Sequence, residues 1–391
     1  EQRITVLHHN FFTSGIGYLK VLFKTDTVPQ EDLYYVGLLK SVLGGMDTEH
    51  YSYADLTSEI HLNSGGVDFS VASYGNLKDP EHFTGALVAA VRVLYDRLDF
   101  GFEILEEILC RSVFCNEKRL LEVLEETRSR ARMRLENAGH STAVSRATSY
   151  FSPTAYFNEI VGGTAYFQFL EDICRNFDDR KELVMDKLYE VSKLLFTRSN
   201  LLISYTADEK GYEKLPNAMT KLTDYLPEGR GKRYEFVHPV KNRNEGLKTS
   251  SQVNYVARCG DFRKKGYEYT GALKILQVIL SYDYLWLNIR VKGGAYGCMS
   301  GFGRSGEGYL VSYRDPNLRE TDQVYEGIVK YLEEFDPDER DMTKYVIGAI
   351  SNLDTPLTPS IKGSRALSAY LSGVTEDMLQ EERDQILSAC K

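Results

Sequence analysis

An internal repeat is the feature of this sequence that most limits the folds open to it. Three short motifs occur twice, in the same order, along the 391 residues. The offsets between the copies are 234, 228 and 219 residues, a slow drift of the kind that differences in loop length produce. Three matches in one order indicate a duplicated unit. The pairs are Gly37-Leu38-Leu39-Lys40 and Gly271-Ala272-Leu273-Lys274, Glu59-Ile60 with Gly65-Gly66 and Asn288-Ile289 with Gly293-Gly294, and Ser145-Arg146-Ala147 and Ser364-Arg365-Ala366.

The spacing of apolar residues predicts both strands and helices in each copy. Residues 83–94 suit a strand, although their pattern does not exclude a helix. The order of elements begins again with a strand at 251–257 and a helix at 271–280. The sequence therefore predicts an α+β protein of two related domains. In the first copy the expected strands are 3–9, 16–24, 67–71, 83–94 and 199–208, and the expected helices are 33–43, 53–62, 98–112, 117–138, 141–151, 165–176, 180–197 and 212–225.

Residues 226–248 have the composition of a linker, because they shift to Gly, Pro, Lys, Arg and Asn. We therefore expect domains at 1–225 and 249–391. After Arg146 the first copy continues through a helix, a strand and another helix, whereas only 26 residues follow Arg365 in the second. Either the second domain is naturally shorter or the sequence stops inside it. We expect the latter, a second domain truncated at its C-terminus.

Composition excludes several classes of function. Hydrophobic residues make up 42% and charged residues 26%, as in soluble globular proteins. The net charge of −9 argues against a nucleic-acid partner, since phosphate binding needs a basic face. No apolar run approaches the roughly 20 residues that span a bilayer, so we expect no membrane partner. The first residues also lack the basic and apolar regions of a secretory signal.

The six cysteines are scattered and form no Cys-x-x-Cys motif. Free thiols in a reducing compartment are therefore expected, and a zinc–thiolate cluster is not. We place the protein in the cytoplasm on this ground.

Seven histidines prompt a search for a zinc site. A zinc protease helix needs His-Glu-x-x-His or its inverse, His-x-x-Glu-His, and neither occurs. The nearest string, Met46 to His50, has a methionine in place of the first histidine, and a thioether is a poor zinc ligand. Glu81-His82 follows Pro80 and has no histidine at the first position of either motif, and His8-His9 lies in an expected strand, where neighbouring side chains diverge. We expect this chain to bind no catalytic metal.

The stretch Leu285–Tyr313 holds the only tryptophan and two glycine clusters. Its string Gly301 to Gly306 fits G-x-G-x-x-G, but the apolar run that follows predicts a strand rather than the helix a phosphate loop requires. We therefore expect a glycine-rich hairpin, with the pair Arg290 and Tyr296 just before it. The pair is either a surface arginine and a sheet tyrosine, or a device that binds a carbonyl and donates to an oxyanion.

The string Ile289-Arg290-Val291-Lys292-Gly293-Gly294-Ala295-Tyr296-Gly297 and the segment 312–318 closely resemble the C-terminal half of the presequence-protease branch (subfamily C) of the M16, pitrilysin/insulysin-like zinc metallopeptidases. Segments 251–256, 48–53 and Gly65-Gly66 are also similar to that family. The resemblance runs from about residue 5 to about residue 375. GGAYG is its most specific part.

The resemblance implies that the chain corresponds to the third and fourth of four related domains. Each such domain is a mainly antiparallel sheet backed by helices, the LuxS/MPP-like metallohydrolase fold, and two bowl-like halves enclose a chamber. The inverted zinc motif belongs to the first of the four domains. The resemblance therefore implies zinc in the complete enzyme and none bound by this chain.

The resemblance also assigns roles to residues. It implies that Arg290 and Tyr296 are catalytic, reaching across the chamber to hold a carbonyl near the scissile bond and to stabilise its tetrahedral state. It implies substrate binding by the adjoining Gly293, Gly294 and Ala295.

We therefore expect the non-catalytic C-terminal half of a zinc-dependent endopeptidase that degrades short unstructured peptides. Its partners would be a zinc-bearing N-terminal half and the peptide substrates, and the chain alone would be inactive. Two alternatives are a catalytically inactive structural or assembly subunit and a stand-alone peptide-binding module.

Overall fold

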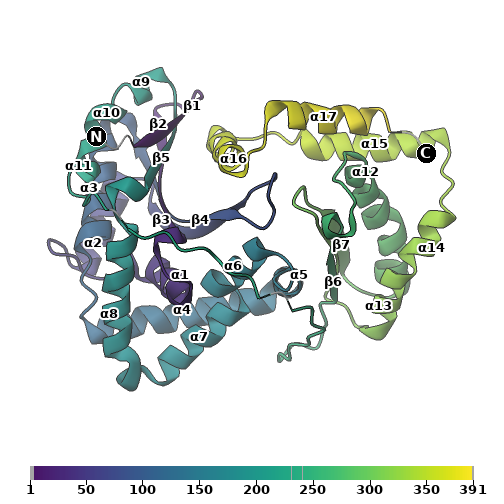
Figure 1. The fold of residues 1–391 in the computed structure, drawn as a ribbon, viewed down its shortest axis with the longest axis horizontal. Coiled ribbons are helices and arrows are strands. Elements are labelled where there is room, and N and C mark those ends of the chain that lie inside the picture. Colours follow the sequence, from purple (N-terminus) through teal and green to yellow (C-terminus); the bar gives the residue numbers. More distant parts are fainter. Residues whose placement is uncertain (1–3, 230, 240, 390–391) are drawn as a thin grey trace.

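The computed structural model describes residues 4–229, 231–239 and 241–389, which form two sheets with their helices (Figure 1). The first sheet has five strands in the order β1-β5-β2-β4-β3, and all its pairs are antiparallel except β1 with β5. All five strands expected in the first copy are present, including that at residues 83–94. They are β1 (Thr5–Asn10), β2 (Ile16–Lys24), β3 (Val67–Gly75), β4 (Phe83–Leu94) and β5 (Leu201–Ala207).

Both faces of the first sheet are covered. On β2, alternate residues point to opposite sides, as a strand requires. Val21 and Phe23 enter the main core, whereas Leu22 belongs to a smaller cluster on the other face. The main core is closed by helices from the same part of the chain, namely α1 (Leu33–Val42), α3 (Leu98–Arg111), α4 (Glu117–Asn137), α6 (Pro153–Gly162), α7 (Thr164–Arg175) and α8 (Phe177–Leu195).

The second sheet repeats one part of the first. Its strands are β6 (Ala257–Asp261), β7 (Gly297–Phe302) and β8 (Glu307–Tyr313), in the antiparallel order β6-β8-β7. That order matches β2-β4-β3, and in both copies a helix follows the first strand: α1 in one and α12 (Ala272–Ile279) in the other. The duplicated α+β unit predicted from the motifs is therefore visible in the topology. The boundaries 1–225 and 249–391 stay a prediction.

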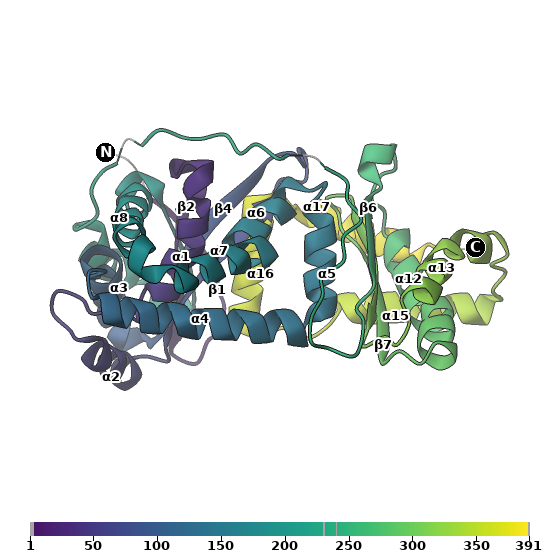
Figure 2. The ribbon, with the colours of Figure 1, turned by 90° about the horizontal axis from the view of Figure 1, so that it is seen from below.

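The two copies exchange helices (Figures 1 and 2). Helix α5 (Gly139–Thr148), from the first copy, packs on β6 and β8 of the second sheet. Helix α16 (Pro359–Ser372), from the second copy, packs on the outer face of the first sheet, where Leu367 joins the cluster of Leu22 and Val88. Gly363 makes this approach possible, because a Cβ atom there would overlap the Thr206 hydroxyl.

The remaining helices complete the outer layers. They are α2 (Tyr53–Asn63), α9 (Glu209–Tyr212), α10 (Leu215–Ala218), α11 (Thr220–Thr223), α13 (Arg319–Glu326), α14 (Ile328–Glu333), α15 (Glu339–Leu353) and α17 (Glu376–Leu387). None of the helices in the described part of the chain combines the length and the hydrophobicity needed to cross a bilayer.

The local predictions failed in three respects. The expected strand at 251–257 begins only at Ala257, because the partner residue Arg314 has φ 48° and turns out of the ladder, leaving one isolated bridge. The expected helix at 212–225 is three short helices around Pro216, which cannot continue a helical hydrogen-bond ladder. Helices α6 and α13 to α17 were not predicted.

The linker 226–248 contains no helix or strand among its described residues, but it is fastened to the first copy. The Tyr234 amide donates to the Asp26 carbonyl at 2.7 Å, and Gln30 makes two hydrogen bonds to the Val237 backbone. Further along, the Glu245 carboxylate accepts from Arg146 at 2.7 and 3.2 Å. The linker is therefore a bound strap rather than a free tether.

Candidate functional site

Arg290 and Tyr296 lie at the junction of a helix and a strand. Helix α12 continues without a break through two wider, π-helical segments, Leu280–Tyr284 and Trp286–Lys292, so Arg290 is helical and the β-prone residues before it are not a strand. The helix ends at Gly293, and β7 begins at Gly297. The expected hairpin is confirmed for β7 and β8. Wide π-helical turns are rare and are often found at functional sites.

The structure brings the predicted pair together. The Arg290 guanidinium lies 5.3 Å from the centre of the Tyr296 ring and 4.4 Å from that of Trp286. It also donates to the backbone carbonyl of Tyr296. Tyr296 is 64% exposed, and its ring edge packs on Tyr313 at 5.8 Å. The tyrosine hydroxyl and the guanidinium therefore share one open surface.

The glycines between the pair are required by the backbone. Gly294 has φ +81°, a conformation that favours glycine. A Cβ atom on Gly293 would lie 2.6 Å from the Ile289 carbonyl. Ala295 is 4% exposed, and its amide donates to that same carbonyl at 3.1 Å. The predicted substrate-binding residues thus form a tight loop whose first role is to set the positions of Arg290 and Tyr296.

A loop that follows β8 braces this arrangement. The Asn317 side chain donates to the Gly293 carbonyl at 2.6 Å. Asp315 is fully buried, and its carboxylate accepts from the Asn317 amide at 2.9 Å and from the Thr321 hydroxyl at 2.6 Å. Sequence reasoning did not single out Asn317 or Asp315 as site residues, although the run Ser312–Leu318 carries the family resemblance. The string Asp315-Pro316-Asn317, which is typical of a turn, was the available signal.

The first copy reaches the edge of this surface through α5. The His140 ring packs edge-on against Tyr313 at 4.8 Å, and Tyr255 lies 5.7 Å from Tyr313. The aromatic surface around Tyr296 therefore includes side chains from both copies.

Cysteine chemistry is disfavoured beside the pair. The Cys298 side chain is 9% exposed, and burial raises the pKa of its thiol to about 11, against a smaller opposing effect of Arg290. A thiol with this pKa carries almost no thiolate at neutral pH. The five cysteines within the described residues are free.

The residues nearest to a zinc motif do not fit a zinc site. Met46 is fully buried in the main core, and the Glu49 carboxylate pairs with Arg111 at 2.9 Å. The His50 ring donates through Nδ1 to the Glu107 carboxylate at 2.9 Å. Burial acts to raise the pKa of Glu107, but hydrogen bonds from Thr48 and His50 lower it overall. Within the described ranges, no group of three or more His, Cys, Asp or Glu side chains is placed to hold a metal ion.

Comparison with known proteins shows which family the chain resembles. Residues 1–173 match the family model for the domain associated with peptidases of family M16, subfamily C, and residues 244–391 match "PreP C-terminal domain". The chain is a C-terminal half of the M16 subfamily C type. It is 38% identical to protein HypA of Clostridium perfringens over 386 residues, and 29% identical to presequence protease 1, chloroplastic/mitochondrial, of Arabidopsis thaliana over 387 residues.

These matches cover almost all of this M16-type half and a smaller part of each relative. They span 99% and 98% of the chain but 40% and 36% of the two relatives. Solved structures share the fold at low identity. A protease from Helicobacter pylori superposes with a TM-score of 0.69 at 12% identity, over 100% of this chain and 92% of its own. A peptidase M16 inactive domain from Pseudomonas fluorescens gives 0.63 at 14%, over 98% and 89%.

Proposed function

We propose that this chain supplies substrate contacts to a zinc-dependent endopeptidase of M16 subfamily C whose zinc site lies on a separate, N-terminal half. The observation that carries the proposal is the convergence of Arg290 and Tyr296 on one exposed surface, held by a loop that only glycine can form. The similarity to presequence proteases supports short, unstructured peptides as substrates.

The chemistry of the pair suits peptide hydrolysis. A guanidinium carries five N–H donors in a planar fork, and the bond to the Tyr296 carbonyl leaves others for a peptide carbonyl. The Tyr296 hydroxyl can donate to the oxygen that becomes negative as the scissile carbonyl turns tetrahedral. Glycine at 293 and 294 lets a substrate backbone approach closely.

Zinc has no suitable ligands on the described residues, so it would be held by the partner half. There the metal would supply a polarising charge and an activated water. The role of this chain is to bind and orient the peptide. The free thiols support a reducing compartment such as the cytoplasm.

The test is reconstitution with a zinc-bearing N-terminal half of a peptidase of the same subfamily. The chain alone should not cleave a fluorogenic peptide, and the mixture should. Arg290→Ala and Tyr296→Phe should each lower kcat/KM of the mixture by about one to three decades, the scale of a lost oxyanion donor. Tyr282→Phe, at a tyrosine 70% exposed on the same helical stretch, is the matched control and should change nothing. Zinc-dependent cleavage by the chain alone, or unchanged kinetics in both variants, would refute the proposal.

One observation favours a second candidate, a catalytically inactive assembly subunit. Arg290 is already engaged by the Tyr296 carbonyl and the Trp286 ring, so the pair could serve only to hold the helix–strand junction. In that case Arg290→Ala would lower the midpoint of thermal unfolding and leave peptide binding by the reconstituted protein unchanged.

A further inference from the structure

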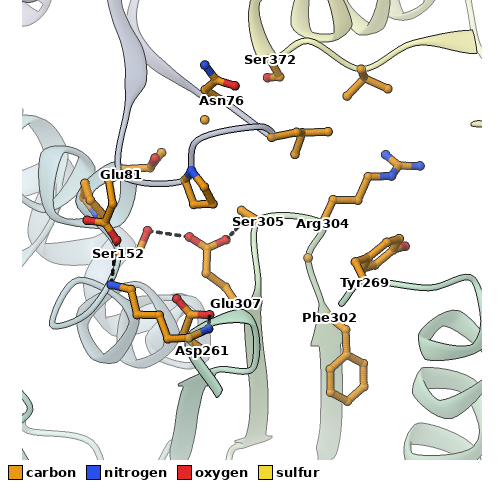
Figure 3. A pocket seen from close by; sticks show the side chains of 18 of the residues that line it. Asn76, Glu81, Ser152, Asp261, Tyr269, Phe302, Arg304, Ser305, Glu307 and Ser372 are labelled. Carbon is orange, nitrogen blue, oxygen red and sulfur yellow. Dashed lines mark hydrogen bonds and ion pairs between the residues drawn. The ribbon is translucent and has the colours of Figure 1, made fainter. Parts of the chain in front are cut away.

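A cavity lies between the two copies, away from Arg290 and Tyr296. Its volume is about 410 Å³, and its walls come from the β3–β4 turn, the start of α6, the segment from the end of β6 to α12, the β7–β8 turn, α16 and α17. Figure 3 shows Arg304 and Tyr269 at one end, and Glu307, Asp261 and Ser152 at the other. Because β7 separates Tyr296 from the β7–β8 turn, the two sites lie about 20 Å apart along the strand. We call this space the seam cavity.

One end of the seam cavity carries three cations and one carboxylate. The cations are Arg304, Arg365 and Lys274, and the carboxylate is Glu382, which is 4% exposed. Burial and repulsion from Arg304 lower the pKa of Lys274. Burial also lowers the pKa of Arg304, and Arg365 lowers it further against an opposing effect of Tyr269. These positive charges therefore destabilise one another in the structure.

Glu382 cannot neutralise this end by itself. One of its oxygens accepts from Arg304, and the other accepts from the Tyr269 hydroxyl at 2.6 Å. Within the described residues, the Arg365 side chain has no ion pair or hydrogen bond, and the contact of the Lys274 side chain is the Tyr269 ring, 6.0 Å from its ammonium. Two cations facing a cavity are left without a counter-charge.

The first copy shows what completes this arrangement. Arg365 matches Arg146 in the repeat, and the Arg146 guanidinium binds two carboxylates: Glu159 at 3.2 Å and, through two nitrogens, Glu245 of the linker. Glu159 lies in α6 beside α1, just as Glu382 lies in α17 beside α12. In the second copy the buried glutamate is used by Arg304, so the repeat arginine lacks both of its carboxylates.

The repeat lysines differ in the same way. Lys40 in the first copy donates to the Val161 carbonyl at 2.8 Å, and its ammonium lies 5.5 Å from the centre of the Tyr166 ring. Its counterpart Lys274 lines the seam cavity instead. At both repeat positions, the cation of the first copy has protein partners, whereas the cation of the second copy lines the cavity.

The other end of the cavity is acidic. Glu307 accepts from the hydroxyls of Ser152 and Ser305, each at 2.5 Å, and Asp261 accepts from the Lys264 amide at 3.0 Å. The Lys264 ammonium is paired with Glu81 at 3.0 Å. Figure 3 shows these carboxylates on the side away from Arg304. The cavity is thus positive at one end and negative at the other.

We propose that the seam cavity binds a short zwitterionic peptide, with its terminal carboxylate on Arg365 and Lys274 and its ammonium toward Glu307 and Asp261. A carboxylate is the group that the matching Arg146 binds in the first copy, and a guanidinium holds it through paired hydrogen bonds. The volume lies within the range of small-molecule sites and accommodates a few residues. This proposal does not rest on the proposed function, because binding is measured on the chain alone.

The test is isothermal titration of the full chain with triglycine, with triglycine amide and with N-acetyl-triglycine. Triglycine should bind with one site per chain. The amide, which lacks the carboxylate, and Arg365→Gln with triglycine should each weaken binding about ten- to a hundredfold, the scale of a lost charge-assisted hydrogen bond. Acetylation of the ammonium should weaken it by a smaller factor. Lys274→Met is a second variant that should weaken binding. Lys362→Gln is the matched control, because Lys362 is a cation on the same helix as Arg365 and its ammonium lies over the Phe11 ring.

Several outcomes would overturn the proposal. Equal affinity for triglycine and for its amide would show that the carboxylate makes no contact that contributes to binding. If inorganic phosphate bound as tightly as triglycine, the cavity would be a site for anions in general and not for a peptide. Equal loss in Arg365→Gln and Lys362→Gln would show that net charge alone is responsible. Equal binding of N-acetyl-triglycine would remove the acidic end from the interaction.

Discussion

The two copies of the repeat use the same positions for different purposes. In the first copy Arg146 is locked between Glu159 and the linker residue Glu245, whereas its counterpart Arg365 faces the seam cavity without a carboxylate. The pair at the glycine loop differs too. Gly65-Gly66 in the first copy is followed by Asp68, whose carboxylate lies 3.6 Å from Arg92, where the second copy presents Tyr296.

The comparison shows that the matching cations make internal contacts in the first copy and line a cavity in the second. At the two repeat positions the first copy uses its cations, Arg146 and Lys40, for internal contacts, and it forms a five-stranded sheet around the larger core. The second copy has three strands in the described residues and leaves Arg290, Tyr296, Arg365 and Lys274 accessible. Equivalent substitutions in the two copies should therefore have unequal effects, on stability in one and on ligands in the other.

The largest expected effect is that of Arg146→Gln. Glu159 is 2% exposed, so removing its cation leaves a buried carboxylate without a counter-charge. We expect a loss of about 3 kcal/mol in the free energy of unfolding, at the lower end of the range for a broken buried pair because the Arg146 side chain is partly exposed. Urea denaturation of the matched variant Arg365→Gln should show a change below about 0.5 kcal/mol. Equal losses would break the comparison.

The second effect concerns the pH dependence of the repeat lysines. Burial, with help from Arg134, lowers the pKa of Lys40 to about 8, whereas the unfolded value is 10.5. A lowered lysine pKa disfavours the folded state below pH 8, and this penalty fades as the pH rises toward 10.5. Lys40→Met removes this penalty. Its free energy of unfolding, relative to that of the native chain, should therefore be about 2 kcal/mol higher at pH 7 than at pH 10.

The same measurement on Lys274→Met sharpens the comparison. Its pKa is lowered by burial in the same direction, but Lys274 lines an open cavity and should give a smaller pH dependence. If the difference in free energy of unfolding between Lys40→Met and the native chain did not change with pH, the charge of Lys40 would not be buried as described.

The third effect tests the exchange of helices. Gly363→Ala places a methyl group against the Thr206 hydroxyl, so α16 must move away from the first sheet. Overpacking of this kind costs about 1–3 kcal/mol, and the better helix propensity of alanine returns up to about 1. We expect a net loss of about 1–2 kcal/mol and faster hydrogen exchange in α16. Gly101→Ala in α3, where the new methyl has ordinary contacts from 3.4 Å, should be neutral or slightly stabilising.

Much of the fold could be predicted from local pattern. The expected strand at 16–24 matches β2, and the expected helix at 117–138 matches α4, whose cap residue Asn116 accepts from the Arg119 amide. The motif order predicted the duplication. Arg290 and Tyr296 were placed together by resemblance, and the structure adds how they are held.

The rest depended on contacts between distant segments. Residues 285–292 are apolar and β-prone, and their helical state follows from continuity with α12 and from burial of Leu285 and Ile289 in the second core. The seam cavity could not be predicted, because its charged residues come from six elements that meet only after α16 and α5 change places. Nothing in the string around Arg365 indicates that Arg304 takes the nearby glutamate.

The exchange of α5 and α16 has a consequence for how the chain becomes stable. Two like units that each lend a helix to the other have the arrangement of a domain-swapped dimer joined into one polypeptide. The linker makes that exchange intramolecular, which raises the effective concentration of each helix near its foreign sheet. Neither unit completes its packing alone, so the two should melt in one transition, and damage to either half should unfold both.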